Sequence, residues 1–305
     1  MNHTTMKAII FVMDADYSVY NRHLNAIRYA QIQGLEIVGI ATDVQMYRQI
    51  DGYPVIPLEN LKSYDIDLLI VASDTYQPIC RWAASSKNVN AKYIVPIKVF
   101  SLPGFELEKY LRIVDNVPTI ISNNCWGGFT YNALGLSFAS PFVNMFIRDE
   151  GYLKLLSDLS GYMQEQPQQI AWGYDGNREK EYPICMLRDV EIHFNHYDSM
   201  EEVLDKWNQR VSRMNWENLF VMMYTKDEDA MQTFVDYQYS HKVCFVPEYM
   251  CECEDASIIP VIGATRDILD QNDFGLLVDA FANGQLPNYN VLDLLLGDIG
   301  QHRIS

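Results

Sequence analysis

Two hydrophobic periodicities alternate along the first hundred residues. Runs that are apolar throughout, such as "KAIIFVM" at 7–13, predict buried strands, and apolar residues three or four positions apart predict helices. Strands are predicted at 7–13, 36–42, 67–73 and 92–97, and helices at 19–34, 57–65 and 76–86. Gly34 is placed to end the first helix. Fully apolar strands alternating with helices indicate a parallel sheet covered on both faces, as in a Rossmann-like domain.

The stretch "SLPGFELEKYLRIVDNVP", with two prolines and a glycine, separates this region from the rest of the chain. We expect a first domain over 1–115 and a second over 116–305. The second is predicted to have strands at 119–124, 142–147, 169–175, 190–197, 219–225, 242–247 and 258–263, and helices at 129–136, 150–164, 199–213, 228–238, 270–283 and 290–297. The fold class is therefore α/β: two α/β domains, the second with a mixed or mostly parallel sheet.

The formal net charge of −17 narrows the possible partners, since Asp and Glu number 40 and Lys and Arg 23. Nucleic acid is not expected as a partner, because phosphate backbones are bound by clustered Lys and Arg. No apolar stretch reaches the roughly 20 residues that a membrane-spanning helix needs. The apolar run after Met6 is short and soon followed by acids, so we expect no leader and a cytoplasmic protein. The sequence does not decide whether the protein forms an oligomer.

The cysteine pattern favours reduced thiols rather than a metal site. Six cysteines are scattered along the chain, at positions 80, 125, 185, 244, 251 and 253. Cys251 and Cys253 form one closely spaced pair, but a structural zinc site needs four ligands and there is no second pair. No metal ligands are therefore assigned, and the cofactor stays unknown.

The first predicted strand-to-helix turn, "VMDADYSVYNR", contains no glycine and has Asp14 and Asp16 where a pyrophosphate would lie. We therefore expect no NAD or FAD there. The stretch "EIVGIATDVQMYRQIDGYPVIPLENLKSYDIDLLIVAS" resembles the Rossmann-like domains of bacterial sugar-modifying proteins. That resemblance implies that Asp43, at the tip of the second strand, binds the ribose or sugar part of a nucleotide. The other interpretation is that Asp43 only begins a turn.

The segment "TIISNNCWGGFTYNALGL" places Cys125 between a predicted strand and a predicted helix. The helix dipole would lower the pKa of the thiol and make it a nucleophile. Gly127 and Gly128 would let backbone N–H groups form an oxyanion site, and Asn123 or Asn124 would donate hydrogen bonds or cap the turn. The alternative is that Cys125 is a small buried apolar residue.

The segment "LRDVEIHFNHYDS", interpreted as a strand, places five polar side chains on one face. They are Asp189, Glu191, His193, Asn195 and Tyr197, with His196 at the end of the other face. Three interpretations stay open: a solvated strand edge, an acid–base pair lining a cleft, or ligands for a divalent cation.

The helix that follows begins at the capping residue Ser199 and carries Arg210 and Arg213 about one turn apart. Two arginines at this spacing could bind a phosphate or carboxylate group through paired hydrogen bonds. They could equally pair with surface acids.

Three segments together carry a family resemblance: "SLPGFELEKY", "ISNNCWGGFTYNALGLSFASPFVNMFI" and "YPICMLRDVEIHFNHYDSMEEVLDKWNQRVSRMNWENLFVMM". Over about residues 100–225 the chain resembles a bacterial family of unknown function whose members are often labelled exopolysaccharide biosynthesis proteins. "NNCWGG" followed by "W-x-x-R-x-x-R" also resembles papain-like cysteine peptidases. That second resemblance would pair Cys125 with His193 or His196.

The leading hypothesis is a protein of exopolysaccharide or glycoconjugate biosynthesis, with a transferase as the candidate enzyme class. It would bind or transform a sugar or nucleotide-sugar in a cleft between the two domains. One alternative is a non-catalytic binding or assembly protein with a degenerate nucleotide fold. A further alternative is a cysteine-dependent hydrolase or acyltransferase using Cys125 with His193 or His196.

Overall fold

The computed structural model describes residues 5–13, 17–43, 47–74, 89–250, 255–261, 277 and 289–298. The chain forms two compact units, Met1–Leu111 with Ala133–Gly135, and Arg112–Asn132 with Leu136–Ser305. Both combine helices and strands, which confirms the α/β class. No helix among the described residues is long and apolar enough to cross a membrane. The helices expected at 76–86 and 270–283 lie outside these residues, apart from Leu277.

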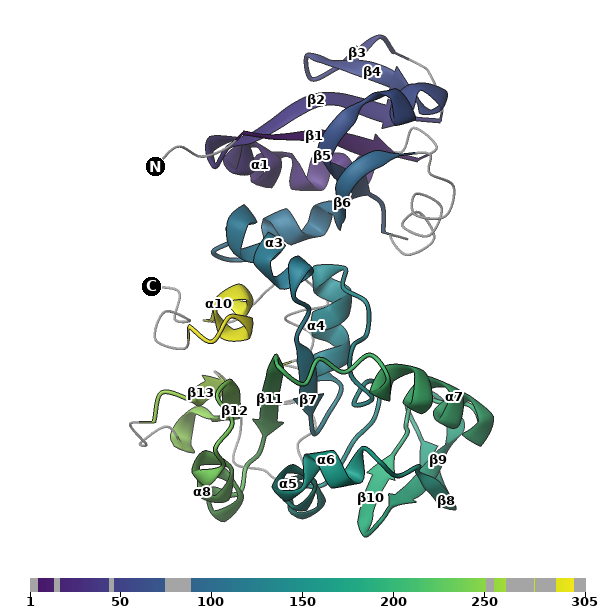
Figure 1. Cartoon of the computed structure of the whole chain (residues 1–305), viewed down its shortest axis with the longest axis vertical. Helices are drawn as coiled ribbons and strands as arrows, with labels where there is room; N and C mark the ends of the chain where they lie inside the picture. Colours follow the sequence, from purple (N-terminus) through teal and green to yellow (C-terminus); the bar gives the residue numbers. More distant parts are fainter. Residues whose placement is uncertain are drawn as a thin grey trace. The chain divides into compact units, whose positions relative to one another are not determined.

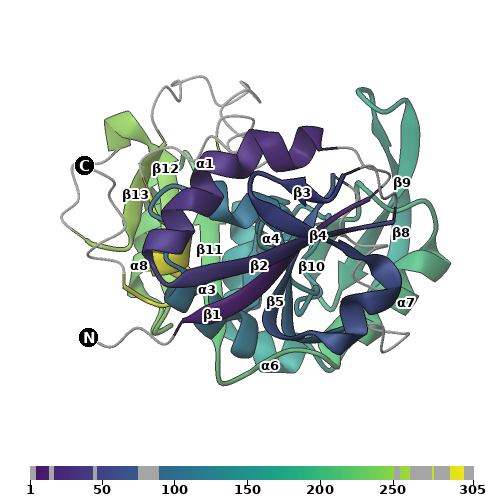
Figure 2. The ribbon, with the colours of Figure 1, turned by 90° about the horizontal axis from the view of Figure 1, so that it is seen from above.

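The first unit is built on a six-stranded sheet in the order β3-β4-β2-β1-β5-β6 (Figures 1 and 2). Its strands are β1 (Met6–Val12), β2 (Leu35–Thr42), β3 (Gln49–Ile50), β4 (Tyr53–Pro57), β5 (Asp65–Ala72) and β6 (Asn90–Pro96). Its helices are α1 (Ser18–Ile32), η1 (Leu58–Ser63), η2 (Ile97–Ser101) and the start of α3 (Leu107–Asp115). Every strand pair is parallel except β3–β4.

The fully apolar strands of the first unit lie where the sequence pattern places them. Ile9 and Leu69 are completely buried in the centre of the sheet. Gly34, at a φ of 103°, follows α1, as predicted for the residue that ends the helix. The β3–β4 hairpin was not predicted, although Asp51 and Gly52 take positive φ values of 49° and 83°. An Asp-Gly pair is a strong sequence signal for such a turn.

The second unit contains a four-stranded parallel sheet in the order β13-β12-β11-β7 (Figure 1). Its strands are β7 (Thr119–Ser122), β11 (Leu219–Tyr224), β12 (Lys242–Pro247) and β13 (Ile258–Val261). The helices of the unit are α4 (Trp126–Leu134), α5 (Asp149–Ser157), α6 (Leu159–Tyr162), α7 (Met200–Val211), α8 (Glu228–Asp236), η3 (Glu248–Met250) and α10 (Val291–Leu295).

A separate antiparallel sheet in the order β10-β9-β8 follows α6 in the chain (Figure 1). Its strands are β8 (Gln168–Asp175), β9 (Lys180–Leu187) and β10 (Val190–His193). One apolar core joins residues of both sheets, because Cys185 and Ile192 of the antiparallel sheet cluster with Val221 and Met223 of the parallel sheet. One face of the antiparallel sheet therefore packs in this shared core.

The structure corrects three expectations for the second unit. Residues 142–147 do not form a strand, because Asn144 takes a φ of 62° and only Phe146 makes a ladder contact, to His193. Strand β9 was not predicted, since Pro183 interrupts an otherwise strand-like run. Strand β10 ends at His193 rather than at residue 197.

Candidate functional site

The hairpin formed by β9 and β10 separates its side chains into a buried face and an open face. One side is buried in the core and carries Cys185, Leu187, Val190 and Ile192. The opposite side, named here the open face, carries Tyr182, Ile184, Met186, Glu191 and His193, each half-buried or exposed. Period-two alternation in paired strands produces this division. Glu191 and His193 therefore share a face, as the sequence pattern predicted.

On the open face, His193 is held between a carboxylate and a phenol. Its Nε2 atom lies 2.8 Å from Glu191 Oε1, and its Nδ1 atom lies 3.3 Å from the hydroxyl oxygen of Tyr182. A neutral imidazole with the proton on Nε2 satisfies both contacts, because Nε2–H donates to Glu191 and Nδ1 accepts from Tyr182. A carboxylate that orients a histidine in this way leaves the other ring nitrogen able to accept a proton.

Aromatic rings flank the histidine on both sides. The ring centroids of Phe146 and Tyr182 lie 5.8 Å and 6.0 Å from that of His193. Phe146 is 40% exposed and is fixed beside His193 by two backbone hydrogen bonds. Tyr182 covers Gly173 of β8, where an added Cβ would lie 2.4 Å from the tyrosine ring. Burial raises the pKa of Tyr182, with smaller contributions from Asp175 and Glu191, so the phenol remains a proton donor.

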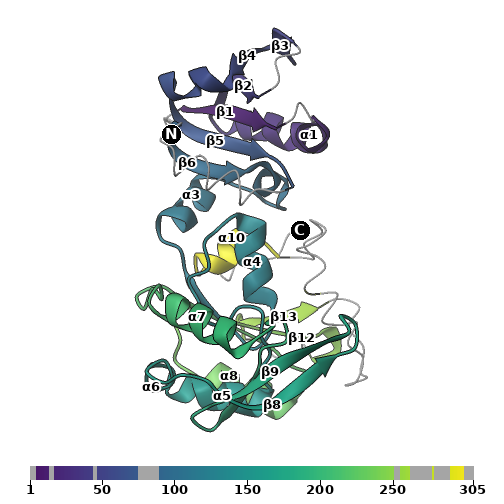
Figure 3. The same cartoon turned by 90° about the vertical axis from the view of Figure 1, so that its right-hand side faces the viewer.

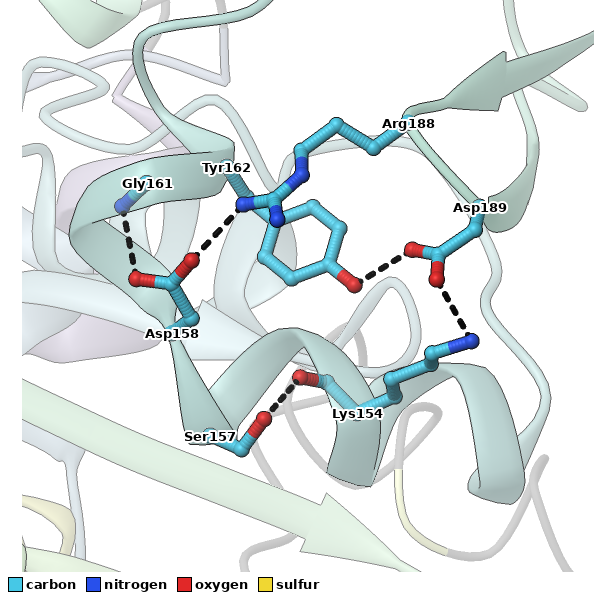
Figure 4. Close-up of polar contacts among 7 residues, drawn as sticks. All are labelled: Lys154, Ser157, Asp158, Gly161, Tyr162, Arg188 and Asp189. Atoms are coloured by element: carbon cyan, nitrogen blue, oxygen red, sulfur yellow. Dashed lines mark hydrogen bonds and ion pairs between the residues drawn. The ribbon is translucent and has the colours of Figure 1, made fainter.

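Asp189 does not join this group, which corrects the expected five-residue face. It lies with Arg188 in the turn between β9 and β10, where Arg188 takes a φ of 54°. The Asp189 carboxylate lies 2.6 Å from Lys154 Nζ and accepts a 2.6 Å hydrogen bond from the Tyr162 hydroxyl (Figure 4). The Lys154 ammonium and the Tyr162 hydroxyl lower the pKa of Asp189 to about 2.

The same turn carries a second ion pair, drawn in Figure 4. Arg188 Nη1 lies 2.7 Å from Asp158 Oδ2, and the guanidinium lies 4.6 Å from the ring centroid of Tyr162. Asp158 also accepts a hydrogen bond from the backbone N–H of Gly161 and so caps α6. These contacts tie the β9–β10 turn to α5 and α6, so the structure gives Asp189 an anchoring role.

Beyond His193 the chain leaves the sheet, and the remaining residues of the expected face separate. His196 lies with its Nδ1 atom 3.3 Å from Arg178, and burial, together with the arginine, lowers its pKa. Tyr197 is buried and donates a 2.8 Å hydrogen bond to the carbonyl oxygen of Val143. Asn195 Oδ1 is buried with no hydrogen-bond partner among the described residues.

The two arginines predicted to act together lie in different surroundings. Arg210 is buried on α7, where it donates to the Tyr197 hydroxyl and to Val143 O and lies 5.1 Å from the ring centroid of Phe138. Arg213 lies beyond the end of α7 and is exposed. A shared anion site is therefore not formed by this pair, because the Arg210 guanidinium is already occupied by groups of the protein.

Cys125 lies in the turn between β7 and α4, as the sequence predicted, but its thiol is buried. The residue is 4% exposed, and Sγ lies 3.8 Å from the carbonyl oxygen of Met145. Burial raises the pKa of the thiol to about 12. The expected lowered pKa is therefore wrong, because burial disfavours the charged thiolate.

The two asparagines beside Cys125 are occupied by the protein itself. Asn124 Oδ1 accepts from the backbone N–H of Trp126 and so caps α4. Asn123 exchanges hydrogen bonds with the backbone of Tyr224, joining the ends of β7 and β11. Both side chains are at least 95% buried, so their hydrogen bonds hold the fold together.

Gly127 and Gly128 lie inside α4 and permit close packing. A Cβ added at Gly127 would lie 3.0 Å from both Ile120 Cγ2 and Ser122 Oγ. A Cβ at Gly128 would lie 3.1 Å from Asn144 Oδ1 and from Val143 Cγ1. Their place in the helix does not match the expected oxyanion site, because close neighbours rather than a space for substrate face the two glycines.

Comparison with known proteins gives a family for the larger part of the chain. The family described as "Domain of unknown function (DUF1919)" matches residues 97–276, more than half of the chain. The chain belongs to this family. Residues 4–95 match a second family, described as "C2185-like, N-terminal".

One relative is an uncharacterized protein of Haemophilus influenzae, 39% identical over 137 residues. The match covers 44% of this chain and 64% of the relative. The DUF1919 match includes the open face and Cys125 but not Asp43. These descriptions name no substrate or reaction.

A second polar group of the DUF1919 region lies at the carboxyl ends of β7 and β11, and sequence reasoning missed it. Asp149, at the start of α5, accepts a 2.5 Å hydrogen bond from Thr225 Oγ1 and a 3.3 Å hydrogen bond from Asn123 Nδ2. Burial raises the pKa of this carboxyl, and Asp227 adds to the shift. Its hydrogen bonds link α5 to both strand ends.

In the first unit, Asp43 directly follows β2 and is exposed, with Thr42 Oγ1 3.4 Å from one of its carboxylate oxygens. Ligand binding there stays a hypothesis. Asp14 and Asp16 lie outside the described residues, as do Cys251 and Cys253. Within the described part of the chain, no group of three or more His, Cys, Asp and Glu side chains is placed to hold a metal ion.

Proposed function

We propose that this protein binds a sugar on the open face and transfers a group to or from it, as a transferase of exopolysaccharide or glycoconjugate biosynthesis. The observation that supports this most is the 2.8 Å contact between His193 and Glu191 on an open sheet face, between the rings of Phe146 and Tyr182. A sugar offers hydroxyl groups to the imidazole and carboxylate and an apolar C–H face to the rings.

The hydrogen bonds suggest how the site would act. A sugar hydroxyl that takes the place of Tyr182 would donate to His193 Nδ1. As the sugar oxygen forms a bond to the electrophilic carbon of an activated donor, the bond between that carbon and its leaving group breaks. The hydroxyl proton passes to Nδ1, and the Glu191 carboxylate stabilises the imidazolium that results.

Charge favours a neutral sugar ring at this site over a phosphate group. Glu191 is an acceptor beside the imidazole, and the chain as a whole has a net charge of −17. Arg178 lies in the turn between β8 and β9. Its guanidinium donates a hydrogen bond to Asn195 O and contacts His196, so it is already engaged by the protein. We therefore expect the diphosphate of a nucleotide-sugar donor to lie away from His193.

A thermal-shift screen tests the proposal. The panel is glucose, galactose, N-acetylglucosamine and their UDP derivatives, with acyl-CoAs for the acyltransferase alternative. At least one sugar is expected to stabilise the wild type, and the stabilisation should be lost in His193→Ala and Glu191→Gln. Transfer activity found with that sugar should fall about 100-fold or more in His193→Ala, since a general base contributes about 10²–10⁴.

His196→Ala is the matched control, because His196 pairs with Arg178 instead of Glu191. This variant should keep the full ligand response. Equal stabilisation of all three variants would refute the site. Binding without turnover in the wild type would favour the non-catalytic alternative, and an acyl-CoA response lost only in Cys125→Ser would favour the cysteine enzyme.

A further inference from the structure

Strand β8 has a free edge. It is the outer strand of the sheet β10-β9-β8, and it pairs with β9 from Gln168 to Asp175 (Figure 3). No other described strand pairs with its second edge. The N–H and C=O groups of such an edge can accept a further strand.

The side chains of β8 are unusually apolar for an exposed edge. Ile170, Trp172 and Tyr174 are 51%, 52% and 65% exposed. Trp172 and Tyr174 are two residues apart and point to the same side of the sheet as Pro183, the residue paired with Trp172. This side continues into the core of the unit through Cys185. The apolar face of the sheet therefore extends beyond the part that the unit itself covers.

The usual protection of an edge strand is limited here. Natural edges carry charges, prolines or bulges that prevent pairing. Strand β8 has a register shift between Gln169 and Ala171, but its pairing with β9 is regular from Ala171 to Asp175. Its one charged residue is Asp175, at the carboxyl end. In a chain with a net charge of −17, the uncharged run 166–174 is a place where two copies can approach without repulsion.

Geometry favours one orientation for two identical edges. Antiparallel pairing about a two-fold axis puts the two Asp175 carboxylates at opposite ends of the pair. A pairing with Asp175 opposite Gln168 of the other copy separates the carboxylates by roughly 20 Å, because antiparallel strands rise about 3.4 Å per ladder position and the register shift in β8 leaves six such steps between these residues. That separation exceeds the screening length of about 8 Å at physiological salt. Parallel pairing would place the two carboxylates side by side.

We propose that a second copy of this chain pairs antiparallel with β8, and that Trp172 and Tyr174 pack across the two-fold axis. The two three-stranded sheets join into one six-stranded sheet. A two-fold axis perpendicular to a sheet preserves its faces, so both open faces lie on the same side of the joined sheet.

Sedimentation velocity of the full chain between about 1 and 100 µM tests this proposal. A concentration-dependent dimer is expected for the wild type. Trp172→Glu/Tyr174→Glu should raise the dimer dissociation constant at least tenfold, because the carboxylates at position 172 would lie directly opposite each other and those at position 174 diagonally beside them. Both side chains are more than half exposed, so the variant is expected to fold, and circular dichroism checks this.

Trp216→Glu is the matched control, because Trp216 is 46% exposed and lies outside β8. This variant should dimerise like the wild type. A wild type that stays monomeric over the whole concentration range overturns the proposal. So does a folded Trp172→Glu/Tyr174→Glu variant that dimerises normally, or a loss of dimer in Trp216→Glu.

Discussion

At the scale of single residues, surroundings decide which polar side chains can act. His193 is fixed by Glu191 and still presents Nδ1 toward a phenol at the surface of the sheet. His196, three residues later, lies against Arg178, and its lowered pKa favours the neutral form. Residue type alone does not separate these two histidines. Their hydrogen-bond partners do.

The Cys125 thiol gives a prediction at this scale. Because its pKa is raised to about 12, the thiolate is scarce at neutral pH, and iodoacetamide should label Cys125 slowly at pH 7. Labelling should accelerate only at strongly alkaline pH or on unfolding. Mass spectrometry of the peptide that contains Cys125 measures this site apart from the other cysteines. Rapid labelling at pH 6–7 would restore the hypothesis of a catalytic cysteine.

At the scale of elements, close packing fixes how α4 lies against β7. Gly127 faces Ile120 and Ser122 so closely that an added Cβ would lie 3.0 Å from each of them. Asn124 caps the start of α4 on one side of Cys125, and Gly127 packs against β7 on the other side, so both fix the turn. The Asn-Asn-Cys-Trp-Gly-Gly sequence is thus explained by packing and capping.

Gly127→Ala tests this explanation. The added Cβ would meet neighbours at 3.0 Å, so the variant should lose roughly 1–2 kcal/mol of unfolding free energy, since overpacking costs about 1–3 kcal/mol and the higher helix propensity of alanine offsets up to about 1. Gly176→Ala is the control, because its Cβ meets nothing within 4 Å. Urea denaturation measures both. An unchanged or more stable Gly127→Ala would contradict the packing account.

The sequence predicted some elements of the site and missed others for physical reasons. An apolar run identified β11, a short β-branched run identified β7, and period-two alternation placed Glu191 and His193 together. The partners from other segments were missed. Tyr182 depends on the register of β9, a strand that Pro183 obscured, and Phe146 depends on a single ladder contact.

The sequence left the burial of Cys125 open as an alternative, and it did not predict the burial of Arg210. Both residues are polar or titratable in type, and both are enclosed by segments distant in sequence. Cys125 lies against Met145 O, and Arg210 lies against Val143 and Phe138. The segment that encloses them was itself predicted as a strand, so its true path could not be anticipated.

At the scale of the whole molecule, the two sheets of the second unit have different roles. The parallel sheet and its helices form the core, and Asp149 links the ends of β7 and β11. The antiparallel sheet has one face in that core and the other open, with the candidate site on the open face and an apolar free edge at β8. A site carried by the strands of a packed sheet holds its side chains more precisely than a site on a loop.

The most direct test of the central claim is nuclear magnetic resonance of the histidine imidazoles in ¹⁵N-labelled protein, titrated with the most stabilising sugar from the thermal-shift panel. If the sugar binds on the open face, His193 Nδ1 should show the largest shift among the six histidines, saturating with the sugar, while His196 stays nearly unchanged. Saturable binding that leaves the His193 resonances unmoved would contradict the account.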